Sequence, residues 1–315
     1  MAKTLLQGEK YSLRKMLESG EQVFSACVWD NMSLRMAHVG GFKSALISGG
    51  TFSEDIIGLP DIGIMTQDNL VHGMERMADS TPLPIVVDAD DGYGETPIHA
   101  FRMCQRLIKA GAAGFSIDDT TGVRGFFRWW NQMRNGEKKI DHEVVSRKKY
   151  LAKIKASLDA CEGTDAIVFA RTEAKLKYGL DEAIERCLLA RELGAEMTMI
   201  IGITSMEDAE YVGKYVPGWK MWPDVMSRNG VPDVDLQAIH QLGFNYVTCH
   251  VLEKGAMAGM LDMARHTVQE KNTVYHDMFE TKYSDEEKKA LDYFQNKIVR
   301  MFDDESEYYN VKDRL

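Results

Sequence analysis

The sequence has few cysteines and no long apolar run. Its five Cys are scattered and form no Cys-x-x-Cys pair, which disfavours a disulfide framework or a zinc ribbon and favours a reduced, cytoplasmic setting. No run of about 18 apolar residues occurs, so we expect no membrane span. The first residues, MAKTLLQGEKYSLRKML, lack the apolar core of a signal peptide.

Basic residues are also fewer than acidic ones. The chain has 38 Lys and Arg against 48 Asp and Glu, which gives a net charge of −10. Such a surface repels nucleic acid and anionic membranes, so we expect neither as a partner. A small anionic substrate is not excluded, because it responds to the local field of a cleft.

What the sequence does have is a repeated alternation of short apolar runs and longer amphipathic segments. The apolar runs are continuous, which is typical of parallel strands buried on both faces. Eight such units predict a closed (β/α)8 TIM barrel, and an open doubly wound sheet is the alternative. The expected strands are Val23–Trp29, Ser44–Ser48, Pro84–Asp90, Ala113–Asp118, Ala166–Arg171, Glu196–Ile201, Trp219–Trp222 and Asn245–His250.

Beyond the eighth unit the chain continues into further helical sequence. Ser284 and Glu287 have the spacing of a capping box, and the final residues are acidic. We expect a barrel over residues 1–265 and a helical extension over residues 266–315 that serves assembly rather than chemistry.

Polar side chains gather where the expected strands end. All strands of a barrel end at one face, and the chemistry of such folds is found there. We therefore expect one site built from Ser48, Gly49 and Gly50 after strand two, Asp88 and Asp90 after strand three, Asp118 after strand four, Arg171 and Glu173 after strand five, and His250 after strand eight.

Five segments in order resemble the isocitrate lyase/phosphoenolpyruvate mutase superfamily. They are SGG at 48–50, GLPDIGIMT at 58–66, DADDGYG at 88–94, AGAAGFSIDD at 110–119 and ARTEAKLKYGLDEAIERCLLARELGAE at 170–196, and the similarity runs from about Tyr11 to Met263. The resemblance implies a Mg²⁺-dependent barrel that stabilises the enolate of pyruvate or a related 2-oxo acid. It also implies a homo-oligomer, a dimer of dimers, in which the last barrel helix is exchanged between subunits.

The acidic segment after strand three suits a divalent cation. Mg²⁺ prefers oxygen ligands and usually keeps several waters beside one or two carboxylates. By the resemblance, Asp90 is expected to bind Mg²⁺, or Mn²⁺, directly, with Asp88 and Asp118 as further ligands, partly through water. Asp118 stands where the family more often has the longer Glu. The alternative is an acidic turn without metal, and Asp91 is expected to face solvent.

Substrate carboxylates have four expected partners, from the ends of strands two and five. Gly49 and Gly50 expose backbone amides, and Ser48 adds a hydroxyl. Arg171 can hold a carboxylate or phosphonate in a fork, although it could instead pair with Glu173.

Proton transfer has two expected carriers, His250 and Tyr93. A His can exchange a proton near neutral pH, and mutases and some decarboxylases of the family carry a His at this position. A structural role is the alternative for His250. By the resemblance, Asp61 lies near the active site, and Glu173 matches the mutases better than the lyases. Asp224 is a further wall residue or a structural one.

Two features depart from the family pattern. The lyases carry a Cys-containing loop after strand four, and residues 118–141 of this chain contain no Cys, so isocitrate or methylisocitrate lyase activity is not expected. Arg124, Arg128 or Asn131 could serve there, on a loop that is either a lid or an interface flap. Strand six ends at Ile201, where lyases place a Glu and mutases a His.

These observations favour C–C bond cleavage in a small 2-oxo or 2-hydroxy carboxylate such as oxaloacetate or a substituted malate. One alternative is C–P bond chemistry, as in phosphoenolpyruvate mutase or phosphonopyruvate hydrolase. The other is a ligand-binding barrel without catalysis.

Overall fold

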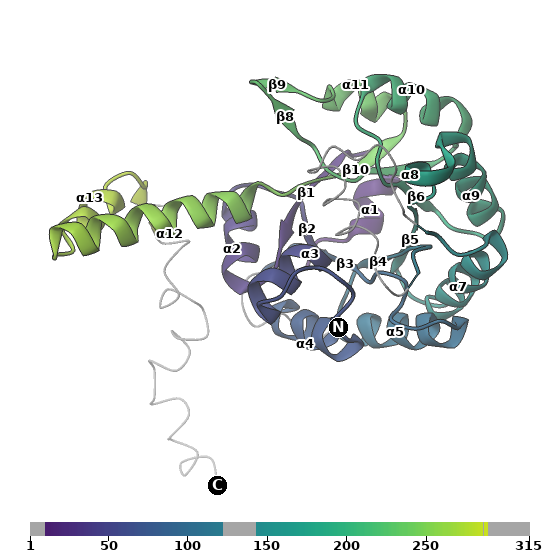
Figure 1. Ribbon diagram of the computed structural model, residues 1–315, viewed down its shortest axis with the longest axis horizontal. Helices are drawn as coiled ribbons and strands as arrows, with labels where there is room; N and C mark the ends of the chain where they lie inside the picture. The colour runs from purple at the N-terminus through teal and green to yellow at the C-terminus, as the bar shows by residue number, and fades with distance from the viewer. Residues whose placement is uncertain (1–9, 122–142, 286, 289–315) are drawn as a thin grey trace, which may run out of the picture.

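A closed barrel of parallel strands forms the centre of the molecule (Figure 1). The computed structural model describes residues 10–121, 143–285 and 287–288. Eight strands close in the order β1-β10-β7-β6-β5-β4-β3-β2, which confirms the predicted barrel and rules out the open sheet. The strands are β1 Val23–Val28, β2 Ser44–Ile47, β3 Ile85–Asp88, β4 Gly114–Ile117, β5 Ile167–Thr172, β6 Met197–Ile200, β7 Trp219–Trp222 and β10 Phe244–Cys249.

Helices surround the barrel, and several begin at residues whose side chains cap them. Thr66 and Asn69 form a reciprocal capping box at the start of α4, and Ser205 accepts a hydrogen bond from the Asp208 amide at the start of α10. Pro97 opens α5, where its missing N–H has no helical partner to lose. The outer helices are α2 Asn31–Val39, α4 Gln67–Met77, α5 Pro97–Lys109, α7 Arg147–Ala160, α9 Leu180–Glu192, α10 Met206–Tyr215 and α11 Leu236–Gln241.

Short elements fill the connections. They are α1 Leu13–Glu18, α3 Gly49–Phe52, the π-helical turn η1 Ser53–Ile57, α8 Lys175–Tyr178, and the antiparallel pair β8 Ser227–Arg228 and β9 Val231–Pro232. α3 and η1 together carry the chain from β2 to the segment before α4.

The barrel interior is packed with side chains and closed at one end. Phe169 and Tyr246 meet edge to face there, with ring centroids 5.1 Å apart. Leu13 and Leu17 of α1 join this interior cluster from the end where the strands begin. The other end, where the strands finish, is therefore the mouth of the barrel.

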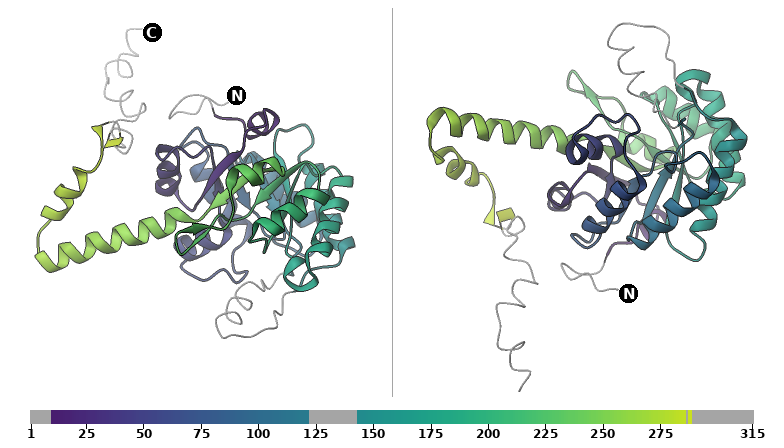
Figure 2. Two further views of the ribbon diagram at one scale, coloured as in Figure 1. Left: turned by 90° about the horizontal axis from the view of Figure 1, so that it is seen from above. Right: turned by 60° about the horizontal axis from the view of Figure 1, so that its bottom comes forward.

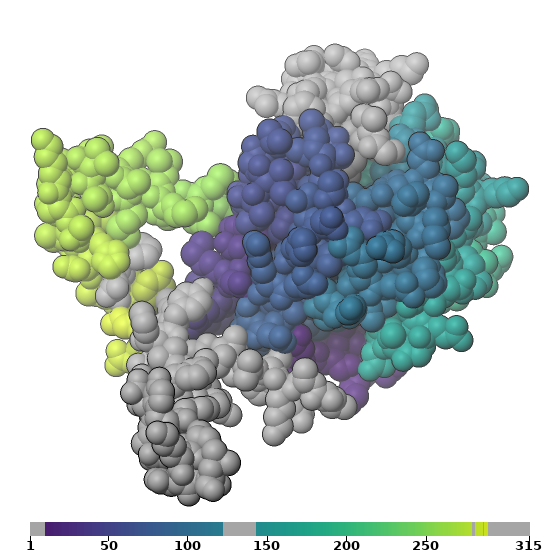
Figure 3. All heavy atoms as spheres, turned by 90° about the horizontal axis from the view of Figure 1, so that it is seen from below, coloured from purple at the N-terminus to yellow at the C-terminus, as the bar shows by residue number. Residues whose placement is uncertain are grey.

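The last helices project away from the barrel as an arm, made of α12 Val251–Glu270 and α13 Val274–Glu280 (Figures 1 and 2). Figure 3 shows the arm standing apart from the body of the molecule. α12 has no buried residue. The predicted boundary between residues 265 and 266 falls within α12, and that division stays a prediction.

Past the arm, Ser284 and Glu287 form the predicted capping box: the Glu287 amide donates to Ser284 Oγ at 3.2 Å, and the Ser284 amide donates to Glu287 Oε2 at 2.7 Å. Over the described part of the chain, no helix combines the length and apolar character that crossing a bilayer requires.

Candidate active site

Strand geometry places the predicted residues at the barrel mouth. Side chains alternate along a strand, so residues two apart point to the same side. Each of four polar residues follows an interior side chain of the same strand by two or four positions. Ser48 follows Leu46, Asp88 follows Val86, Arg171 follows Phe169 and His250 follows Tyr246. The four polar residues therefore continue the rows of interior side chains to the rim.

Arg171 lies at the centre of an acidic cluster. Its Nη1 is 2.9 and 3.0 Å from the two carboxylate oxygens of Asp88, and its Nη2 pairs with Glu173. Asp118 Oδ2 lies 3.9 Å from Arg171 Nε. Three carboxylates thus meet one guanidinium, and Arg171 is only 8% exposed. This excess of negative charge in a poorly hydrated place favours the binding of a cation.

The turn after β3 has an unusual backbone. Asp90, Gly92 and Tyr93 adopt φ angles of 49°, 83° and 55°, in the left-handed region. For a residue other than Gly this conformation is strained by about 1–3 kcal/mol, and such strain is typical of functional sites. The Asp118 amide donates to the Asp90 carbonyl at 2.7 Å, which ties the turn to the end of β4. Asp90 itself is buried.

The prediction that Asp91 faces solvent is wrong. Lys153 of α7, which is itself buried, reaches into the turn and places its Nζ 3.0 Å from Asp91 Oδ2 and 2.8 Å from the Asp91 carbonyl. Asp91 Oδ1 accepts a hydrogen bond from the Tyr93 amide at 2.9 Å. Asp91 therefore anchors the strained turn, and it does so through a partner 62 residues away in the sequence.

Asp118 and its neighbour Asp119 are both fully buried, but their carboxylates accept hydrogen bonds from different parts of the chain. Asp118 Oδ1 accepts from the Thr120 amide and hydroxyl at 2.9 and 2.7 Å. Asp119 accepts from the Glu173 amide at 2.9 Å and from Arg186 at 3.0 Å. Burial raises the pKa of Asp119, against the effect of its hydrogen bonds. The sequence pointed to no role for Asp119, which links the ends of β4 and β5.

The carboxylates at the mouth suit a hydrated divalent ion. Over the residues that the structure describes, no group of three or more His, Cys, Asp or Glu side chains is close enough to enclose a metal ion. Mg²⁺ needs no such cage, because it commonly keeps several waters with one or two carboxylates. Asp88, Asp90 and Asp118 supply oxygen donors of the kind that Mg²⁺ and Mn²⁺ bind, and the strained turn holds Asp90 in a buried place. Their assignment as ligands stays a prediction.

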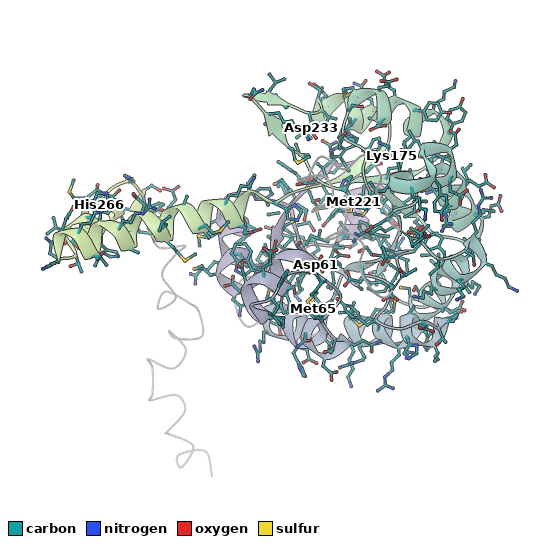
Figure 4. The ribbon with its side chains drawn as sticks, in the orientation of Figure 1. Asp61, Met65, Lys175, Met221, Asp233 and His266 are labelled. Carbon is teal, nitrogen blue, oxygen red and sulfur yellow. The ribbon has the colours of Figure 1, made fainter. Side chains whose placement is uncertain are left out.

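The segment after β2 lies beside the end of β3, on the side away from β4. Ser48 caps α3 by accepting a hydrogen bond from the Thr51 amide at 3.5 Å. Gly49 and Gly50 form the first turn of this helix. A Cβ on Gly50 would lie 3.6 Å from Asp61 Oδ2, so the structure brings Asp61 beside the predicted substrate wall. Figure 4 locates Asp61 and Met65 on the segment next to α3 and α4.

His250 lies between side chains from two other strand ends. Its Nδ1 lies 3.1 Å from Asp224 Oδ1, and its Nε2 lies 3.2 Å from Ser48 Oγ. Burial lowers the pKa of His250, but its contacts with Cys27 and with the Asp224 carboxylate outweigh this effect and raise the pKa. Asp224, whose role the sequence left open, is thus a partner of His250.

A cleft of about 360 Å³ adjoins the acidic turn. Its lining includes Asp90 and Tyr93 of the turn and Met65 and Gln67 from the segment that leads into α4. Gln67 donates to the Gly92 carbonyl at 3.0 Å and so connects α4 to the turn.

Two other sequence predictions concern the rim. Arg124, Arg128, Asn131 and the lid or flap to which they belong lie outside the described residues. Ile201 follows β6 and packs against the interior cluster, so an apolar side chain fills the position where the family has an ionisable group.

Comparison with known proteins agrees with this architecture. The sequence model of the family "Phosphoenolpyruvate phosphomutase" matches residues 13–268. The 2-methylisocitrate lyase of Escherichia coli (strain K12) is 36% identical over 171 residues, which are 54% of this chain and 54% of that protein. The oxaloacetate decarboxylase of Rhodopseudomonas palustris (strain ATCC BAA-98 / CGA009) is 35% identical over 201 residues, which are 64% of this chain and 66% of that protein.

A solved structure shows the same fold. Oxaloacetate acetylhydrolase in complex with the inhibitor 3,3-difluorooxalacetate matches with a TM-score of 0.71 at 26% identity, over 81% of this chain and 84% of that one. The chain spans less than two thirds of the length of both curated relatives, with 54% and 66% of their residues aligned. The family match itself covers most of the barrel and agrees with the predicted resemblance. The chain belongs to the phosphoenolpyruvate phosphomutase family, within the isocitrate lyase/phosphoenolpyruvate mutase superfamily.

Proposed function

We propose that the protein is a Mg²⁺-dependent enzyme that cleaves a C–C bond in a small 2-oxo or 2-hydroxy dicarboxylate related to oxaloacetate or malate. One observation carries the proposal, namely that the same barrel mouth holds Arg171 with three carboxylates and, beside them, Ser48 in contact with His250. The oxaloacetate decarboxylase and the oxaloacetate acetylhydrolase to which the chain is similar support this substrate class.

The residues at the mouth would have distinct roles in catalysis. Asp90, with Asp88 and Asp118 partly through water, would hold Mg²⁺, which supplies positive charge against the oxygen of the developing enolate. Arg171 holds a substrate carboxylate, and substrate binding competes with Asp88 and Glu173 for its guanidinium. Gly49 and Gly50 offer amides to the other carboxylate, and Asp61 borders this place. After bond cleavage, the enolate takes a proton from His250, Tyr93 or water.

Two sequence features argue against neighbouring activities. Methylisocitrate lyase activity is not proposed despite the similarity to that enzyme, because residues 118–141 lack the Cys of the lyase loop. The apolar Ile201 weakens the C–P alternative, since mutases have a His there. The identity of Glu173 favours that alternative, because a Glu at this position matches the mutases better than the lyases.

We also propose a homo-oligomer in which the arm packs on a second copy. Several apolar side chains of the arm are about half exposed or more, namely Val251, Met257, Met260, Leu261, Val268, Val274 and Met278. Exposed apolar surface of this extent is typical of interaction sites. A dimer of dimers and a cytoplasmic location stay predictions from the family and the composition.

A panel of substrates tests the proposed function. The protein is incubated with Mg²⁺ and, separately, with oxaloacetate, substituted malates, phosphonopyruvate and phosphoenolpyruvate, and the release of pyruvate and phosphate is followed. Phosphorus NMR detects mutase turnover, which releases neither. We expect cleavage of an oxaloacetate-like or malate-like compound, and little activity for Asp90→Ala.

The panel also separates the alternatives. Turnover of phosphonopyruvate or phosphoenolpyruvate alone would show that the enzyme acts on C–P bonds. Failure to turn over any compound, together with no thermal shift from Mg²⁺ plus oxalate, would contradict both the enzyme and the ligand-binding readings.

A further inference from the structure

His250 stands between an acid and a hydroxyl at the rim of the mouth. Asp224 follows β7, His250 follows β10 and Ser48 follows β2, so three strand ends contribute one side chain each. The distances are 3.1 Å from Asp224 Oδ1 to His250 Nδ1 and 3.2 Å from His250 Nε2 to Ser48 Oγ. Rows of acid, imidazole and hydroxyl move protons in unrelated enzymes.

Asp224 fixes which ring nitrogen of His250 can exchange a proton. The Asp224 carboxylate has no hydrogen to donate, and its negative charge 3.1 Å from Nδ1 favours a hydrogen on that nitrogen. Nε2 is then the nitrogen that changes its protonation state. Cys27 of β1 also acts on the ring, and Cys27 and Asp224 together raise the pKa of His250.

The direction in which the Ser48 hydroxyl donates its hydrogen depends on whether His250 Nε2 is protonated. The oxygen has two lone pairs and one hydrogen, and the Thr51 amide at 3.5 Å occupies one lone pair. When Nε2 is protonated it donates to the second lone pair, and the hydroxyl hydrogen is available to the substrate. When Nε2 is deprotonated, the hydroxyl donates to Nε2 instead.

We propose that Ser48 is the proton donor to the enolate carbon, that His250 resupplies Ser48, and that Asp224 is the positioning residue for His250. This inference rests on the proposed function. As the new C–H bond forms, the O–H bond of Ser48 breaks, and the Nε2–H bond of His250 breaks as a new O–H bond forms. His250 becomes neutral and regains a proton from water, which its 37% exposed side chain can reach. Its raised pKa favours the charged starting state at neutral pH.

Exchange of the pyruvate methyl hydrogens for deuterium tests the transfer itself. The protein is incubated with Mg²⁺ and pyruvate in D₂O, and proton NMR follows the loss of the methyl signal. We expect Ser48→Ala and His250→Gln to lower the exchange rate about 100-fold or more, and Asp224→Asn to lower it about tenfold. Oxalate affinity should change little in Ser48→Ala if the hydroxyl acts as a donor rather than as a binding group.

Two matched variants complete the exchange experiment. Asp159→Asn removes an exposed carboxylate at the far end of α7, which contacts only Lys155 among the described residues, and should exchange at the wild-type rate. Tyr93→Phe tests the competing donor. Unchanged exchange in Ser48→Ala, or a loss seen only in Tyr93→Phe, would overturn the proposal.

A second measurement does not depend on activity. Nitrogen-labelled histidine reports by NMR whether both ring nitrogens of His250 carry hydrogen at pH 7. We expect a doubly protonated ring in the wild type and a lowered pKa in Asp224→Asn, with no change in Asp159→Asn. A neutral ring in the wild type, or a pKa indifferent to Asp224, contradicts the relay even if the enzyme is active. A normal titration in a protein that neither exchanges nor cleaves contradicts the proposed function, and the catalytic role of the relay with it.

Discussion

At the scale of single residues, the site depends on charges whose partners are far apart in sequence. The acidic turn could be predicted from DADDGYG alone, because three carboxylates follow a buried strand. Its anchoring could not, since Lys153 looks like any other base of α7 until the fold brings it to Asp91. The same holds for Asp224, which becomes meaningful only beside His250.

Lys153→Met should destabilise the protein and weaken its metal site. Removing one partner of a buried ion pair typically costs about 3–5 kcal/mol, because the other charge stays buried. Chemical denaturation measures the loss in unfolding free energy. Lys155→Met on the same helix is the control, because its pair with Asp159 is about half exposed and should contribute about 1 kcal/mol or less. Equal losses in the two variants would show that the Lys153–Asp91 pair has no special role.

The free energy of unfolding should vary with pH because of the protonation of His250. Its pKa is raised in the folded state, so its contribution is fully present below the unfolded pKa of about 6.5 and is lost as pH rises through the folded value. The stability difference between wild type and Asp224→Asn should therefore shrink between pH 6 and the alkaline range. Denaturation at a series of pH values measures it, and a difference that grows with pH would have the wrong sign.

At the scale of elements, the strands were predictable and the short connections were not. Continuous apolar runs identified all eight barrel strands, because a strand buried on both faces has no polar side to interrupt it. Thr66 and Ser205 cap the helices that follow them through local hydrogen bonds. α3 and η1 were not predicted, because they have only four and five residues and their packing depends on tertiary contacts.

One such contact joins α4 to α3. A Cβ on Gly73 of α4 would lie 2.6 Å from the buried ring of Phe52, so the helices meet where only Gly fits. Gly73→Ala should destabilise by about 1–3 kcal/mol despite the higher helix propensity of Ala. Denaturation of the single variants and of Gly73→Ala/Phe52→Leu forms a double-mutant cycle. We expect the smaller Leu to relieve the clash, and strictly additive effects would refute this contact.

At the scale of the whole molecule, the arm is the feature that the barrel does not explain. The sequence predicted helical sequence after the eighth unit, but not that α12 would leave the barrel with apolar side chains exposed, because the pattern of one chain does not show what covers a helix. In the proposed homo-oligomer, a second copy of the chain would cover these apolar side chains.

Charges introduced on the arm should therefore disrupt assembly. Met257→Lys/Leu261→Lys places two cations where we expect apolar contacts between copies, so sedimentation should show a smaller species than the wild type. Val231→Lys changes a similarly exposed apolar residue on the β8–β9 hairpin and should leave the mass unchanged. A monomeric wild type, or a double variant of unaltered mass, would remove the basis for the oligomer.

The central claim is that the carboxylates at the mouth bind a metal that works on a 2-oxo acid, and calorimetric titration with oxalate tests it most directly. Oxalate mimics the enolate, so its binding should require Mg²⁺ and should weaken roughly tenfold or more in Asp90→Ala. The Asp159→Asn control should bind as the wild type does. Oxalate binding that is equally tight without Mg²⁺, or unaffected by Asp90→Ala, would contradict the account.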